Sequence, residues 1–94
     1  MLFTLEKMQI DEGMCSPVRV GHRQTGEVRI FDSKVSQDTK LIHSVEEVSC
    51  GWQLLMGGVC QHLNTSHIAE ILERGKGMVR FRTQTSVYEL REFA

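Results

Sequence analysis

Residues 65–93 read TSHIAEILERGKGMVRFRTQTSVYELREF, and this stretch decides the fold. Apolar and polar residues alternate over 78–83 and again over 87–93, which is the pattern of half-buried antiparallel strands. A Gly-Lys-Gly turn precedes the first run and a Thr/Ser-rich link joins the two, so the stretch predicts a β-meander. The side chains expected to face inward are Val79, Phe81, Tyr88 and Leu90.

The segment before that turn, 67–73, fits two structures. Its apolar residues match one face of a short helix that Gly75 would end. Against the helix, the segment is short, two of its three large apolar residues are β-branched, and a good hairpin connector follows it. We favour a strand and keep the helix as the alternative.

The first third of the chain predicts one long strand and one hairpin. Residues 2–10 are rich in apolar residues and lack helix caps, which favours a strand. Val18 and Val20 share one face of a run that begins at Pro17, and 27–31 alternates again. The polar residues 23–26 between these runs predict the turn of a β-hairpin.

The middle of the chain predicts a loop, a short helix and a second hairpin. Residues 32–40 are polar and rich in turn formers, which indicates a surface loop. Ser44-Val45-Glu46-Glu47 matches a capping box, and Gly51 is placed to end a two-turn helix. The runs 52–56 and 59–63 flank a Gly-Gly pair and predict a tight hairpin, whose first residue, the only tryptophan, is expected to anchor the core.

These elements together predict a single domain over residues 1–94 of mainly β class (β-rich α+β). A chain of 94 residues has room for one hydrophobic core. We expect a small bent sheet or barrel of about six or seven antiparallel strands with one or two short helices.

Composition limits the compartment and the class of function. The chain is 40% hydrophobic and 24% charged, with a net charge of −1 and only short apolar runs, so we expect no membrane span. Three cysteines without paired spacing fit a reducing compartment, and the N-terminus lacks the features of a secretory signal. We therefore expect a cytoplasmic protein.

One basic cluster interrupts an otherwise mixed charge pattern. Arg74, Lys76, Arg80 and Arg82 follow one another with no acid among them, and Arg19 and Arg29 join them in a candidate surface for nucleic acid or an acidic partner. The simpler interpretation pairs these arginines with Glu73 or Glu89 across the meander. We favour the simpler one, because exposed aromatic residues do not alternate with the basic ones.

Metal and catalytic motifs are weak. Cys60, His62 and His67 have side chains that can ligate zinc, yet their spacing lacks the paired ligands of structural zinc sites. Buried free cysteines and surface histidines explain them better, so we expect no metal and no cofactor. No nucleophile, phosphate-loop or metalloprotease motif occurs, and we expect no enzymatic activity.

The sequence therefore predicts a non-enzymatic interaction module, a regulator or stoichiometric inhibitor that acts by binding a protein. The contact surfaces expected for it are the loop Lys34–Lys40 and a strand edge, through which a homodimer could also form. A nucleic-acid-binding small β-barrel that uses its basic strand face is the alternative, and a metal-binding protein is the second alternative.

Overall fold

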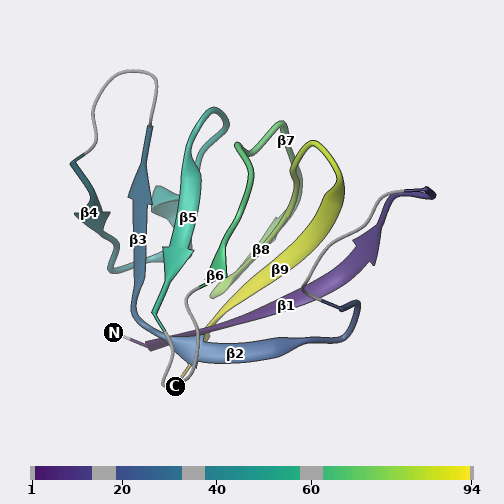
Figure 1. The fold of residues 1–94 in the computed structure, drawn as a ribbon. Coiled ribbons are helices and arrows are strands. Elements are labelled where there is room, and N and C mark those ends of the chain that lie inside the picture. The colour runs from purple at the N-terminus through teal and green to yellow at the C-terminus, as the bar shows by residue number, and fades with distance from the viewer. Residues whose placement is uncertain (1, 14–18, 33–37, 58–62, 94) are drawn as a thin grey trace.

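The structure, a computed structural model, describes residues 2–13, 19–32, 38–57 and 63–93. In these residues nine strands form two antiparallel sheets (Figure 1). One turn of 3-10 helix lies between two of the strands in the sequence. The predicted mainly β class is confirmed. Figure 1 shows the strands β3 and β5 of one sheet standing across β1 and β2 of the other.

The first sheet has five strands and contains the meander that the alternating runs predict. Its strands, in spatial order, are β2 (Arg23–Gly26), β1 (Leu2–Ile10), β9 (Ser86–Phe93), β8 (Met78–Arg82) and β7 (Glu70–Gly75). The hairpin between β7 and β8 closes with the pair Gly75 and Met78, so its turn has two residues. Gly77 has a φ of +67° there, which glycine adopts without steric cost. The ambiguous segment is thus strand from Glu70 onward.

The second sheet is smaller and has four strands. In spatial order these are β4 (Lys40–Leu41), β3 (Val28–Phe31), β5 (Gln53–Met56) and β6 (Leu63–Asn64). Pairing of Met56 with Leu63 leaves residues 57–62 between β5 and β6, so the predicted tight Gly-Gly turn is wrong. The predicted loop 32–40 lies mostly outside the described residues, and Lys40 already belongs to β4.

The hairpin predicted within 17–31 is also wrong. Residues 23–26 are strand β2, which pairs with β1, whereas β3 pairs with β4 and β5. Only Glu27 separates β2 from β3, so the chain passes from one sheet to the other without a turn. Gly26 lies at this corner, where an added Cβ would stand 2.6 Å from the carbonyl oxygen of Gly57. The two sheets therefore meet closely at a position that has room only for glycine.

The hydrophobic core fills the space between the two sheets. Phe81 on β8 is fully buried, and its ring stacks on Tyr88 of β9 with centroids 5.6 Å apart. These two residues are direct cross-strand neighbours, as the alternation requires. The predicted inward residues are all buried, and the other residues of the core cluster that lie on strands are Phe3, Leu5, Val28, Ile30, Leu54, Met56 and Leu63.

A single 3-10 turn, η1 (Val45–Glu47), contacts β8 and β9. The predicted capping box is present, with Glu46 N donating to the Ser44 hydroxyl and the Ser44 N–H donating to the Glu47 carboxylate. The predicted second turn is absent, because the backbone of Val48 is already extended.

The tryptophan at the start of the predicted second hairpin does not anchor the core. Trp52 is 38% exposed and lies just before β5, which begins at Gln53. Ile68, whose N–H donates to the carbonyl of Trp52, takes the buried position instead. Among the described residues, no helix has the length and apolarity needed to cross a membrane.

Candidate interaction surface

Five charged side chains form a row across the outer face of the first sheet, one from each strand. The strand register places Arg23 beside Glu6, Glu6 beside Glu89, Glu89 beside Arg80, and Arg80 beside Glu73. We call these five residues the charged row. Because side chains alternate along each strand, the row lies on the face opposite the core.

Ion pairs connect the members of the charged row. Arg23 Nη2 lies 2.8 Å from Glu6 Oε1, and Arg80 Nη2 lies 2.7 Å from Glu89 Oε2. Arg80 Nη1 also lies 3.6 Å from Glu73 Oε2. Glu6 and Glu89 are like charges in directly opposed positions, a destabilising arrangement that the arginines on either side offset. The predicted pairing of arginines with Glu73 or Glu89 is therefore present for Arg80.

Glu89 is the best-buried member of the charged row, with a side chain only 7% exposed. The hydrogen bond from Arg80 is the main cause that lowers the pKa of Glu89 below its ordinary value of 4.5, and Arg91 on the same strand lowers that pKa further. Burial acts in the opposite direction but is outweighed. Glu89 is thus a fixed anion that holds two guanidinium groups.

We expect the stability of the protein to decrease in acid partly through Glu89. Its pKa in the folded state lies below the unfolded value, so the unfolded chain binds more protons as the pH falls through 4.5 and then through the folded pKa. Urea midpoints measured from about pH 6 to about pH 3 should therefore fall for the wild type and fall less for Glu89→Gln. Arg80→Met, which removes the main hydrogen-bond donor, should flatten the same part of the profile. Unchanged profiles in both variants would contradict this assignment.

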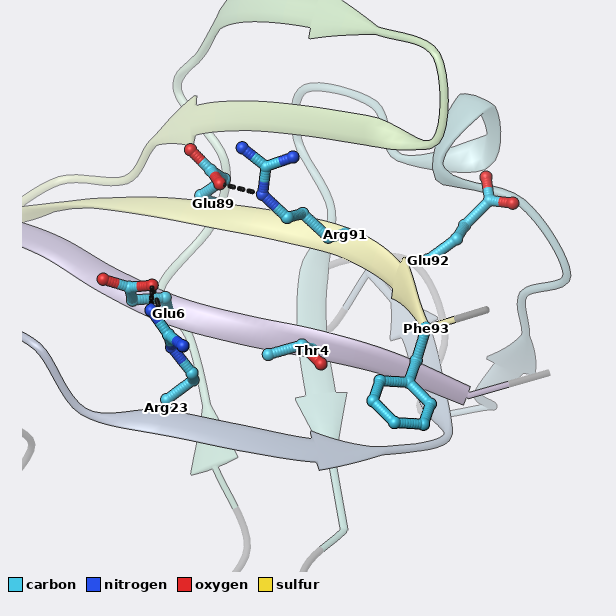
Figure 2. Close-up of a pocket in the computed structure, with 7 residues that line it drawn as sticks. All are labelled: Thr4, Glu6, Arg23, Glu89, Arg91, Glu92 and Phe93. Carbon is cyan, nitrogen blue, oxygen red and sulfur yellow. Dashed lines mark hydrogen bonds and ion pairs between the residues drawn. The ribbon is translucent and has the colours of Figure 1, made fainter.

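Beside the charged row, the outer face is hollowed over Thr4 (Figure 2). The hollow has a volume of about 310 Å³. Thr4 and its neighbour Thr25, whose hydroxyls lie 3.1 Å apart, are short compared with the charged side chains around them. The residues that line the hollow are Thr4, Glu6, Arg23, Glu89, Arg91, Glu92 and Phe93.

Two exposed apolar side chains lie at one end of the sheet, and one of them, Phe93, lines this hollow. Leu2 on β1 and Phe93 on β9 are paired in register, and they are 45% and 57% exposed. In Figure 2 the Phe93 ring extends from β9 across β1 toward β2. The outer face thus combines an apolar pair, a hollow and ion-paired arginines, and of these side chains phenylalanine and arginine are types enriched at the centres of protein interfaces. We call the apolar pair and the hollow together the outer-face site.

The predicted basic residues do not gather on one surface. Arg29 lies on β3 of the second sheet, where it lines a separate hollow, and its Nη1 is 3.5 Å from the Thr39 hydroxyl. Arg19 is exposed in the segment before β2, and Lys76 is exposed at the tip of the β7–β8 turn. The side chain of Arg82 is paired with Asp11 at 3.0 Å.

Arg74 has a structural contact rather than a place in the outer-face site. Its guanidinium donates to the carbonyl oxygens of Val45 and Val48, at 2.9 and 2.8 Å, and so binds the end of η1 to the edge of the first sheet. At the other end of η1, the carboxylate of Glu92 accepts from the Val45 N–H at 3.4 Å. These contacts place a negative group at the start of the turn and a positive one at its end, as the direction of the peptide dipoles favours.

Of the three candidate metal ligands, only His67 lies within the described residues. Cys60 and His62 fall within 58–62, which the structure does not describe. His67 is half-buried, with Nε2 3.9 Å from Asp32 Oδ1. Among the described residues, no three side chains of the metal-binding types form a cluster.

Reasoning from the sequence missed the outer-face site. Alternation did place Glu89 and Arg91 on the polar face of the last strand, but nothing local indicated that β1 lies beside β9. No protein-family model, curated protein or solved structure matches this chain.

Proposed function

We propose that this protein is a non-enzymatic binding module that acts by binding a partner protein through the outer-face site. The observation that carries the proposal is the exposed pair Leu2 and Phe93 beside a hollow lined by ordered arginine–glutamate pairs. An exposed phenylalanine gains most of its burial energy only when a partner covers it. A regulator or stoichiometric inhibitor in the cytoplasm fits this mode of action.

The edge strands of both sheets are short, bulged or covered, which favours the outer face of the first sheet over a strand edge as the contact surface. β4 and β6 have two residues each, and β7 carries a bulge between Ile71 and Glu73. The edge at β2 is approached by Gly57, and Gln24 donates to the carbonyl of Met56. Short, bulged or covered edges resist the addition of another strand. The homodimer expected through a strand edge stays a prediction.

The charge pattern of the outer face supports a protein partner more than a nucleic acid. The arginines Arg23, Arg80 and Arg82 are each within 3.0 Å of a carboxylate oxygen. A phosphate backbone carries a negative charge at every nucleotide, so beyond any group that reaches a guanidinium Nη it would meet the repulsion of those carboxylates. A protein partner can present both signs of charge and an apolar group.

A peptide-display selection against the immobilised protein tests this function. We expect binders from the wild type whose affinity falls at least ~10-fold on Leu2→Ser/Phe93→Ser, because a central apolar contact contributes about 1.4 kcal/mol or more. Leu72→Ser is the matched control, since Leu72 is 44% exposed on β7, an edge strand of the same sheet that is separated from β9 by β8. A selection without binders, or binders lost equally in the control, would refute the proposal.

A further inference from the structure

We infer that the outer-face site recognises an acidic segment of the partner, with a carboxylate bound by the Nη groups of Arg91 or of Arg23 and an adjacent apolar side chain packed on Phe93 and Leu2. This inference rests on the proposed function and specifies the chemistry of its partner.

The spare hydrogen-bonding capacity of the site consists mainly of donors. Arg91 donates from Nε to Glu89, and neither of its Nη groups has an acceptor among the residues the structure describes. Arg23 donates from Nε and Nη2 to the same oxygen of Glu6, at 3.1 and 2.8 Å. Its Nη1 therefore also has no acceptor among the described residues. The two arginine side chains are 60% and 68% exposed. A ligand that supplies acceptors can therefore use this spare capacity.

The acidic residues of the site have little capacity left to bind a cation. Both oxygens of Glu89 already accept, one from Arg80 and one from Arg91. In Figure 2 the carboxylate of Glu92 points away from Thr4, and one of its oxygens accepts from the backbone of η1. The acceptors that lack a partner within the described part of the chain are one oxygen of Glu6 and the other oxygen of Glu92. A basic ligand would thus find fewer partners than an acidic one.

The charged row also holds Arg91 in place. Glu73 binds Arg80, Arg80 binds the buried Glu89, and Glu89 binds Arg91 through Nε. An arginine fixed through Nε presents both Nη groups, a geometry that matches the two oxygens of a carboxylate. Because the side chain is already oriented, less conformational entropy is lost on binding.

The position of Phe93 indicates that the ligand has an apolar side chain next to its carboxylate. Its ring lines the same hollow as Arg91 and Arg23, so a ligand that reaches the guanidinium groups also contacts the ring. A lone carboxylate would leave Phe93 and Leu2 uncovered, whereas an adjacent apolar side chain buries them. The segment expected is therefore acidic and apolar at neighbouring positions.

The peptides from the selection described above test this inference. We expect them to be enriched in Asp or Glu next to an apolar residue, and their Asp→Asn or Glu→Gln forms to bind at least ~10-fold more weakly by fluorescence anisotropy. Arg23→Gln/Arg91→Gln should remove this discrimination between acidic and amide peptides, and Arg91→Lys should reduce it, because lysine keeps the charge but loses the fork. Arg82→Gln is the control, because it changes an arginine on the same face but outside the hollow. This variant should discriminate between acidic and amide peptides as the wild type does.

The failure of this inference is distinguishable from the failure of the proposed function. Peptides that depend on Leu2 and Phe93 but are neutral or basic would overturn the acidic preference and leave the binding module standing. If Arg23→Gln/Arg91→Gln preferred acidic peptides over their amide forms as strongly as the wild type does, the inference would also be overturned. Short single-stranded DNA that displaces the peptides, with an affinity that falls steeply with salt, would identify nucleic acid as the ligand and refute both.

Discussion

The Phe81→Ala variant should lose about 3–5 kcal/mol of unfolding free energy, a large part of the roughly 5–15 kcal/mol that small domains possess. Phe81 is fully buried on β8, between β9 and β7 of the first sheet, and its ring stacks on Tyr88. Truncation removes buried apolar area and leaves a cavity that neighbours from both sheets cannot fill without moving. The measurement is the urea midpoint at neutral pH, combined with the slope of the transition.

Phe93→Ala is the matched control for this prediction. The substitution is chemically the same, but Phe93 is 57% exposed on the outer face, so its truncation should change stability by only about 0.5 kcal/mol. If Phe81→Ala were no more destabilising than Phe93→Ala, the assignment of inward and outward faces in the meander would be wrong.

The Gly26→Ala variant should be destabilised by about 1–3 kcal/mol although it adds a single methyl group. The added Cβ would stand 2.6 Å from the carbonyl oxygen of Gly57, which is a backbone atom and cannot move aside like the end of a flexible side chain. One of the two sheets would have to shift to relieve this overlap. Thermal unfolding should show a clear decrease in Tm, since 1 kcal/mol corresponds to roughly 4–8 °C in a domain of this size.

Gly75→Ala provides the comparison for the corner. An added Cβ at Gly75 would meet only the end of the Met78 side chain, at an ordinary 3.6 Å. We expect its stability to stay within about 0.5 kcal/mol of the wild type. Equal effects of the two substitutions would show that the general cost of replacing glycine, rather than the contact between the sheets, determines the result.

The sequence predicted the fold best where neighbouring residues decide the structure. The strands Met78–Arg82 and Ser86–Phe93 follow from alternation, and the capping box at Ser44 forms as its residues indicate. Prediction failed where a polar strand resembles a turn. Residues 23–26 contain turn-forming residues but form β2, because pairing with β1 outweighs their local preference.

The candidate site was less predictable than the fold, because it depends on which strands are neighbours. Arg80 was assigned to the polar face of its strand correctly, yet its partners in the charged row come from β7 and β9 on either side. Arg74 was grouped with Arg80 in the sequence but has no part in the charged row. It belongs to the same basic cluster in the sequence, but it binds the carbonyl groups of η1.

The sequence by itself determined the class of fold, the two faces of the meander and the net charge of −1. Only the tertiary structure decided that the first strand lies beside the last, so that Glu6 faces Glu89 and Leu2 faces Phe93. The physical reason is that alternation fixes the face of each residue within its own strand. Pairing between strands far apart in the chain depends instead on how both sheets bury the whole core, and a local pattern does not encode that energy.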